Sequence, residues 1–373
     1  MKPIYLDYNA STPVAPRVFE EMLPYLREKY GNPSSSHAFG IACRAGIEQA
    51  RERLALLLRC DASEIIFTSG ATESNNMVIK GIAKAAGKGK HFITSRIEHP
   101  AVLEPCRHLE RFGYRVTYLP VDRFGIVDPA DLEKAVTPDT ALVTIMHSNN
   151  EVGTIQDIGE LARITAARGV PFHTDAAQSV GKVRMQVDDL GVDFLTVAGH
   201  KFYAPKGIGA LYIRKGRKLP PLLHGAGHER GFRPGTENAA FIVGIGEAAM
   251  IAAPIIESEG ARQIQLGKKL YQGLRQAGLE VHLNGHPEKK LPNTWNISFG
   301  GFDAISIMEL LAGVAVSPGA ACHGKLIEPS HVLVAMGVDR DLARGAIRFS
   351  LGRETTEPEI DEVIARLAQG LIR

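Results

Sequence analysis

Short apolar runs and stretches with helical spacing alternate along the first two thirds of the chain. The runs have the length of strands and lie at 65–68, 91–95, 116–120, 141–146, 170–175, 193–199 and 209–214. Helical patterns at about 72–87, 99–111, 130–136 and 155–168 separate the first five runs. This alternation predicts crossover connections and a mostly parallel seven-stranded sheet, and continuous apolar runs are typical of strands covered on both faces. The last two runs have no full helix between them, which predicts an antiparallel strand at one edge.

The pattern changes near residue 240. A long helical stretch, 238–278, contains Pro254, which predicts a break near 253 because proline cannot continue a helix. Shorter patterns follow it, with strands at 279–283 and 294–299 and helices at 303–312, 329–336, 340–346 and 356–371. The chain is therefore expected to be an α/β protein with a large domain, 14–255, and a smaller α+β domain formed by 1–13 and 256–373.

Composition narrows the class of protein. The chain has 373 residues, 45% of them hydrophobic and 23% charged, which is ordinary globular usage. Its net charge of +2 predicts no general attraction to nucleic acid or to a membrane surface. Four cysteines without a C-x-x-C pair argue against a disulfide framework, a zinc finger or a thioredoxin-type site. Neither a signal peptide nor a membrane-spanning run is recognised, so the expected location is the cytoplasm. No metal site is assigned.

The first candidate site follows the run at 65–68. There Ser69-Gly70-Ala71-Thr72 precedes a predicted helix, whose free N-terminal amides and positive dipole end suit a phosphate group. A plain helix cap is the alternative interpretation. The chain lacks both the G-x-x-x-x-G-K-[ST] and the G-x-G-x-x-G spacing, which excludes a P-loop or a Rossmann nucleotide site.

Polar residues also follow the other predicted strands. They are His99, Asn149, Asp175, Gln178, His200 and Lys201. Ligands of parallel α/β sheets bind beyond the carboxyl ends of the strands, so these side chains are expected to meet. A lysine can form a Schiff base with an aldehyde, and a buried carboxylate can keep a pyridine nitrogen protonated. With a phosphate at the helix N-terminus, Lys201, Asp175 and Thr72 together predict a site for pyridoxal 5′-phosphate.

Longer motifs support this interpretation. They are YLDYNASTP (5–13), GNPSSSH (31–37), TSGATESNN (68–76), EHPAV (98–102), NNEVGTIQDI (149–158), HTDAAQ (173–178), GHKFYAPKGIGALY (199–212), HERGFRPGTEN (228–238), ACHG with EPSHVLVAMGV (321–338) and RFSLGRETTEPEID (348–361). In this order and nearly end to end, the chain resembles the class V aminotransferase-like enzymes, specifically the cysteine desulfurases and selenocysteine lyases. The resemblance implies the fold type I of pyridoxal-phosphate transferases and a homodimer.

The same resemblance implies a role for each site residue. The cofactor would be held by Lys201, Thr72, His99, Asp175, Gln178, His200 and, from a second subunit, Thr236. Asn149 and Arg353 would bind the substrate carboxylate, since a guanidinium fork suits a planar anion. Lys201, His99 and Cys322 would be catalytic, with Cys322 the nucleophile that takes the sulfur atom of L-cysteine as a persulfide and leaves L-alanine.

Three positions depart from the common desulfurase pattern. Ala198 replaces a serine that usually contacts the phosphate, and the loops SPGAACHG (317–324) and FRPGTEN (232–238) are closer to the selenocysteine lyase branch. A selenocysteine lyase is therefore the alternative activity. A further alternative is a protein that does not use Cys322 as a nucleophile: a pyridoxal-phosphate β-lyase, a plain aminotransferase or a sulfur-relay protein. A sulfur- or selenium-acceptor protein is the expected partner, besides the small-molecule substrate.

Overall fold

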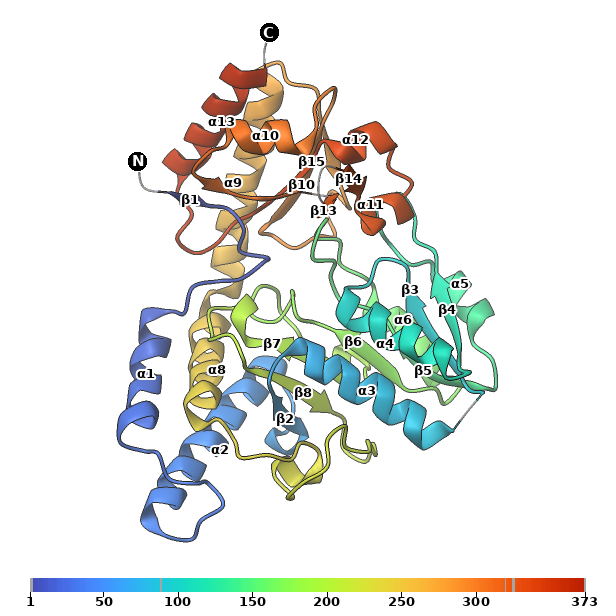
Figure 1. Cartoon of the computed structure of the whole chain (residues 1–373), viewed down its shortest axis with the longest axis vertical. Coiled ribbons are helices and arrows are strands. Elements are labelled where there is room, and N and C mark those ends of the chain that lie inside the picture. The colour runs from blue at the N-terminus through green and yellow to red at the C-terminus, as the bar shows by residue number, and fades with distance from the viewer. Residues whose placement is uncertain (1–2, 88, 319, 324–325, 372–373) are drawn as a thin grey trace.

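The computed structural model describes residues 3–87, 89–318, 320–323 and 326–371, without the side chains of 320–323 and 326–327. Figure 1 shows two parts, one above the other, with a long helix running from the lower part into the upper one. The lower part contains a seven-stranded sheet, and the upper part contains both ends of the described chain.

The seven-stranded sheet follows the predicted runs closely. Its strands are β2 (Ile65–Thr68), β3 (His91–Ser95), β4 (Arg115–Leu119), β5 (Thr140–Thr144), β6 (Phe172–Asp175), β7 (Phe194–Ala198) and β8 (Gly209–Ile213). Their order is β2-β8-β7-β6-β5-β3-β4. β8 runs antiparallel to both neighbours and the other pairs are parallel. The predicted α/β class is confirmed, but the antiparallel strand lies one place inside the edge because β2 forms the edge beyond it.

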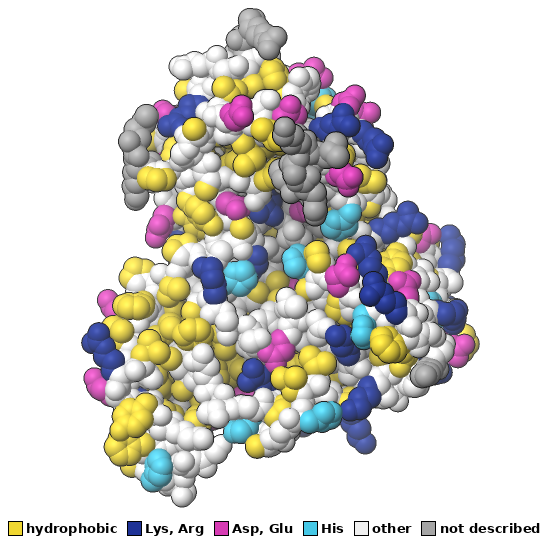
Figure 2. Space-filling view, viewed as in Figure 1, with side chains coloured by type: hydrophobic (Ala, Val, Ile, Leu, Met, Phe, Trp, Pro, Cys, Tyr) yellow, Lys and Arg dark blue, Asp and Glu magenta, His cyan; other side chains and the backbone are white. Residues whose placement is uncertain are grey.

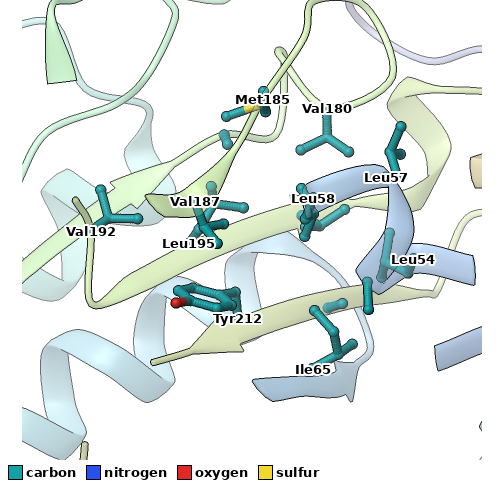
Figure 3. Close-up of a cluster of buried hydrophobic side chains, with 14 of the residues drawn as sticks. Leu54, Leu57, Leu58, Ile65, Val180, Met185, Val187, Val192, Leu195 and Tyr212 are labelled. Carbon is teal, nitrogen blue, oxygen red and sulfur yellow. The ribbon is translucent and has the colours of Figure 1, made fainter. Parts of the chain in front are cut away.

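Helices cover both faces of this sheet. In the lower part they are α1 (Pro16–Arg27), α2 (Ala38–Leu58), α3 (Ala71–Ala86), α4 (Pro100–Arg111), α5 (Pro129–Ala135), α6 (Ile158–Ala166), α7 (Val187–Leu190) and α8 (Ala239–Ala252). Successive strand side chains alternate between two buried clusters: Ile65 belongs to one that includes residues of α2, α6 and α8, whereas Ile66 belongs to one that includes residues of α3 and α4. Figure 3 shows the first cluster, in which Leu54 and Leu58 of α2 lie over Ile65, Leu195 and Tyr212 of the sheet.

The predicted break at Pro254 is confirmed. α8 ends at Ala252, a 3-10 turn covers Ala253–Ile255, and α9 (Ile256–Gln276) continues into the upper part. Within the described residues the run Ala239–Gln276 is long and apolar enough to cross a membrane by length and composition alone, and 56% of its most apolar window is buried. Because α8 packs against α1 and α2 in the core, this apolar character has a structural explanation.

The upper part is a four-stranded antiparallel sheet with helices around it. The sheet has the order β12-β15-β10-β9, formed by β9 (Val281–Asn284), β10 (Thr294–Phe299), β12 (Ser317–Pro318) and β15 (Ala346–Ser350). The remaining elements are β1 (Ile4–Tyr5), α10 (Ala304–Leu310), β11 (Val314–Ala315), β13 (Ala320–His323), β14 (Leu326–Pro329), α11 (His331–Ala335), α12 (Arg340–Arg344) and α13 (Glu357–Leu371). Ile4 and Leu6 belong to the core of this part. The domain division at 13/14 and 255/256 itself stays a prediction.

A small apolar cluster joins the two parts beside the strand ends. Ile97 and Met146 of the lower part pack there with Val332, Leu333 and Met336 of the upper part. Residues of β15 and of the N-terminal segment share one cavity with residues at the carboxyl ends of β6 and β7, where predicted site residues lie.

Candidate active site

A cavity of about 600 Å³ opens at the carboxyl ends of the parallel strands, under the upper part. Six of the predicted residues line it: Thr72, His99, Asp175, Gln178, His200 and Lys201. The N-terminal segment and β15 close it from the other side. Figure 2 shows this waist of the molecule, where histidine side chains (cyan) gather between the two parts. The predicted cluster of strand-end residues is therefore one cavity wall.

Lys201 ends a 3-10 turn, Gly199–Lys201, directly after β7. Its Nζ donates hydrogen bonds to the carbonyl oxygens of Asn9, at 2.6 Å, and Ala10, at 2.9 Å. Burial, with a smaller contribution from Arg348, lowers the pKa of Lys201 to about 8, although Asp175 acts in the opposite direction. A larger share of the amine is consequently neutral near neutral pH, which is the form that attacks an aldehyde.

Asp175 is the last residue of β6, and its side chain is held by two hydrogen bonds. Oδ2 accepts from Asn75 Nδ2 at 2.7 Å, and Oδ1 accepts from the Ala177 amide at 2.9 Å. Asn75 comes from α3 and Ala177 from the loop after β6, so two elements fix the carboxylate plane. A fixed carboxylate at the cavity wall suits a protonated ring nitrogen.

The surroundings of both cavity histidines favour the neutral imidazole by lowering its pKa. His99 caps α4, where its Nδ1 accepts from the Ala101 amide at 3.0 Å, so a neutral ring carries its proton on Nε2. Burial lowers the pKa of His99, and Lys201 and His331 lower it further against the opposite effect of Asp175. Burial, with Lys201 and Lys206, lowers the pKa of His200 to about 4. A neutral imidazole face can stack on an electron-poor ring.

The N-terminus of α3 forms the anion-binding end of the cavity. Gly70 has φ 151°, a region that favours glycine, and Thr72 lies in the first helical turn. Gly209 holds this loop against the sheet, because a Cβ there would lie 2.6 Å from the Val197 carbonyl oxygen and 2.7 Å from Gly70 Cα. The first amides of a helix have no intrahelical acceptor and carry its positive end, which suits a phosphate. Ala198 lines the same cavity without a hydroxyl group.

The structure does not bring Asn149 to the cavity. Its side chain is fully buried, and its Nδ2 donates to the Ile97 carbonyl oxygen at 2.9 Å. Its Oδ1 accepts from the amides of Glu151 and Val152 at 2.9 and 3.0 Å. These bonds shape the loop and leave no free polar atom for a ligand. The neighbouring Asn150 lines the cavity instead.

Arg353, the second predicted carboxylate ligand, does not line this cavity but a smaller neighbouring pocket that also includes Lys201. Its guanidinium group stacks over the Tyr203 ring at 4.1 Å, and its amide donates to the Tyr203 hydroxyl at 2.7 Å. Arg348 on β15 lines the cavity, where its Nη2 pairs with Asp7 Oδ1 at 2.8 Å and its Nη1 donates to the Asn150 carbonyl oxygen at 3.0 Å. Arg348 Nε is buried without a hydrogen-bond partner in the described part of the chain, which points to an anionic ligand.

Thr236 and Cys322 complete the predicted set. Thr236 is exposed and is not part of the cavity wall of its own chain, as expected if it serves a second subunit, so its role stays a prediction. Cys322 lies on β13 opposite Ile327, but its side chain is outside the described part of the molecule. The strand just before it is joined to the site, because Ser317 Oγ accepts from Arg348 Nη2 at 2.8 Å. Among the described residues no group of three metal-binding side chains is found.

Reasoning from the sequence missed several cavity residues. These include Asn9, Ala10 and Ser11 of the motif YLDYNASTP and Lys206 of the motif GHKFYAPKGIGALY, none of which has a role in the sequence-based prediction. Asn150 is one position from the predicted Asn149, and Arg348 is five positions from the predicted Arg353, within the same motifs. The motifs could have identified the segments, whereas the choice within each segment depends on the direction of the side chain.

Comparison with known proteins identifies the class. The pattern of the family "Aminotransferase class-V" matches residues 4–363, and the chain belongs to this family. "Cysteine desulfurase IscS" of Dictyoglomus turgidum is 50% identical over 99% of this chain and 95% of its own. Human "Cysteine desulfurase" is 45% identical over 100% of this chain and 82% of its own. A solved "NIFS-LIKE PROTEIN" is 42% identical with a TM-score of 0.93 over 99% of both chains. The structure "SspA in complex with cysteine" is 40% identical with a TM-score of 0.83 over 93% of this chain and 98% of its own.

The cofactor of this family is pyridoxal 5′-phosphate, and the cavity fits it. The amine of Lys201, the carboxylate of Asp175 and the helix N-terminus at Thr72 provide the groups that its aldehyde, ring nitrogen and phosphate require. A side chain at Gly209 would push against the Gly70 backbone and so disturb the loop that receives the phosphate. The donor set therefore agrees with the cofactor at each of its three functional groups.

Proposed function

We propose that the protein is a cysteine desulfurase that converts L-cysteine to L-alanine and transfers the sulfur atom to Cys322 as a persulfide. One observation carries the proposal: a single cavity holds Lys201, Asp175, the α3 N-terminus and Arg348, in a chain half identical to a named desulfurase over 99% of its length. The sequence alternatives of selenocysteine lyase and β-lyase are not favoured, because the relatives of highest identity reported above carry the desulfurase name.

When bound, pyridoxal phosphate supplies an electron-withdrawing ring that stabilises negative charge at the substrate α-carbon. His99 would cover one face of that ring and Asp175 would keep its nitrogen protonated. Gln178, Thr72 and His200 would hold its hydroxyl and phosphate groups, with Thr236 of a second subunit. Lys201 would accept the α-proton, a task suited to an amine whose pKa lies near 8.

Arg348 and Asn150 are proposed to orient the substrate by its carboxylate, in place of Arg353 and Asn149. The buried, unpartnered Nε of Arg348 is a donor aimed at no other described group. Because Nη1 and Nη2 already have partners, Nε would donate a charge-assisted hydrogen bond to one carboxylate oxygen, which favours a negatively charged group at this place.

The Arg348→Leu variant is expected to reduce kcat/KM for L-cysteine about 100-fold, mostly through KM, because a charged hydrogen-bonding partner of the substrate is lost. The matched control is Arg353→Leu, which removes a partly buried guanidinium group from the Tyr203 ring. That control should change kcat/KM by less than about fivefold, since surface and packing changes act mainly on stability. Steady-state kinetics of both variants, with melting temperatures, decide the matter. The reverse pattern would restore Arg353 as the carboxylate ligand.

The sulfur transfer requires a thiolate. The Cys322 thiolate would attack the substrate sulfur, forming an S–S bond while the carbon–sulfur bond breaks. The bonding electrons return to the substrate carbon, which takes a proton and becomes the methyl group of alanine. Burial raises the pKa of Cys60 and Cys106 to about 12, so these thiols stay protonated at neutral pH. Cys43 is buried and its Sγ donates to the Lys29 carbonyl oxygen.

The active unit is proposed to be a homodimer. Exposed aromatic and aliphatic side chains gather at the ends of α1 and α2, namely Tyr30, Phe39 and Ile41. Figure 2 shows apolar side chains (yellow) at the lower-left tip of the molecule, where these helix ends lie in Figure 1. An exposed apolar patch of this kind is typical of an interface. A dimer would also explain why Thr236 lies outside the cavity of its own chain. An acceptor protein for the persulfide is a further expected partner.

The test is a side-by-side turnover assay with L-cysteine and L-selenocysteine. We expect L-cysteine to yield alanine in an amount equal to the persulfide and sulfide formed, at a rate that rises with added thiol acceptor. Mass spectrometry should find 32 Da added to the peptide that contains Cys322 (about one sulfur atom, by the thiolate chemistry above). Turnover of L-selenocysteine alone would contradict the proposal and assign a selenocysteine lyase.

A further inference from the structure

A second lysine, Lys182, contacts two residues of the cavity wall, Gln178 and Asn9. Its Nζ donates to Gln178 Oε1 at 2.9 Å and to Asn9 Oδ1 at 3.0 Å. Both partners are neutral amides, and no ion pair of Lys182 is found among the described residues. A lysine side chain placed in the interior with amide oxygens as its partners costs desolvation energy, so its presence needs an explanation.

Lys182 contributes to the orientation of two amide groups. Nζ donates to the oxygen, and not to the NH₂ group, of each amide. Burial, with Lys201 and Arg348, lowers the pKa of Lys182, but a lysine amine has N–H donors in its neutral form as well as in its charged form. With Oε1 on Lys182, Gln178 directs its Nε2 to the Asn9 carbonyl oxygen, at 2.9 Å, on the cavity side. Without Lys182 the two ends of the Gln178 amide have similar shape, and a rotation by half a turn would present an oxygen to the cavity.

The same lysine is one of two donors to Oδ1 of Asn9, which is 1% exposed and joins both parts of the molecule; the other donor is Asn293 Nδ2, at 2.9 Å. Asn9 Nδ2 donates to the Asn150 carbonyl oxygen at 3.1 Å and to Thr294 Oγ1 at 2.8 Å. The Asn9 amide donates to Ser350 Oγ at 2.9 Å. Its carbonyl oxygen accepts from Lys201 Nζ at 2.6 Å as well as from Gln178. A change in the Asn9 orientation would therefore move a direct partner of Lys201.

We propose that Lys182 is a positioning residue of the active site: it holds the Gln178 amide with its NH₂ group on the cavity side, where the cofactor hydroxyl would bind, and it helps to hold Asn9, whose backbone carbonyl accepts from Lys201. The inference rests on the proposed function only for the identity of the cofactor. The partners of Lys182, Gln178 and Asn9, take no part in the proposed sulfur transfer to Cys322, so the inference does not depend on the sulfur substrate.

The experiment measures cofactor binding as well as turnover. The variant Lys182→Met keeps the length of the side chain and removes its donors. We expect pyridoxal phosphate to bind to the cofactor-free variant about tenfold more weakly, the loss of one or two hydrogen bonds. The pH midpoint of the visible absorbance of the bound cofactor should also shift. Lys182→Arg, which again only donates, should recover most of the affinity, and Lys84→Met on the exposed side of α3 should behave as the wild type.

A double-variant comparison separates positioning from plain stability. If Lys182 acts through Gln178, Lys182→Met should have little further effect on cofactor affinity when Gln178→Ala is already present. Equal effects in both backgrounds, together with the same drop in melting temperature, would overturn the proposal in favour of a structural role. So would an unchanged affinity and pH midpoint in Lys182→Met. Since these readouts need no sulfur substrate, failure of the desulfurase assay would leave them interpretable.

Discussion

Replacing Lys201 by alanine is expected to reduce alanine production from L-cysteine by about 10²–10⁴-fold or more, because acid–base assistance alone contributes that much. Lys201 is the cavity amine whose pKa is lowered to about 8, and its Nζ is held by two backbone carbonyl oxygens. The variant also loses the amine that reacts with the cofactor aldehyde, so the cofactor should be released more easily on gel filtration.

The control for this prediction is Lys84→Ala, since Lys84 is exposed on α3 and touches no part of the cavity. It should retain wild-type turnover and absorbance. In the wild type, the rate at which cofactor-free protein reacts with pyridoxal phosphate should rise with pH and level off above about 8, because the reactive amine is neutral above its pKa. A Lys201→Ala variant that keeps more than a tenth of the wild-type rate would remove Lys201 from the proton-transfer role.

Replacing Cys322 by alanine is expected to abolish persulfide formation and to lower alanine production by at least about 10²-fold, in line with the loss of an activated nucleophile. The cofactor-binding residues are on other elements, so the visible absorbance of the bound cofactor and its change on adding L-cysteine should persist. This combination of intact binding with lost turnover separates the role of Cys322 from a folding defect.

Cys60→Ala is the matched control, because it removes a half-buried thiol whose pKa is raised to about 12 by burial. Alanine formation and persulfide content should stay within about twofold of the wild type, as for most substitutions away from a site. If Cys322→Ala still released sulfide from L-cysteine at the wild-type rate, with pyruvate and ammonia in place of alanine, the protein would be a β-lyase and the persulfide proposal would fail.

Local patterns determined much of the architecture. Continuous apolar runs of four to seven residues predicted all seven strands of the large sheet, because a strand covered on both faces has no polar side to show. Pro254 predicted the end of α8 through chain geometry alone. The meeting of Thr72, His99, Asp175 and Lys201 followed from a general property of parallel sheets, whose carboxyl ends share one edge.

The tertiary structure decided which of two similar residues close together in the sequence faces the cavity. Asn149 and Asn150 have the same side chain, and only the loop geometry turns the first inward to bind Ile97, Glu151 and Val152 and the second toward the cavity. Arg348 and Arg353 are likewise the same residue type. Arg348 lies on β15 above the cavity, whereas Arg353 follows a turn and stacks on Tyr203.

The sequence by itself determined the class of fold, the cofactor chemistry and the segments that form the site, since these depend on local spacing and on residue type. The tertiary structure alone decided which side chain of each segment faces the cavity and which distant residues hold it. Asn9 and Lys182 are 173 positions apart and meet through a hydrogen bond of 3.0 Å. Such a contact exists only after the chain has folded, because the direction of each side chain depends on the packing of every element around it.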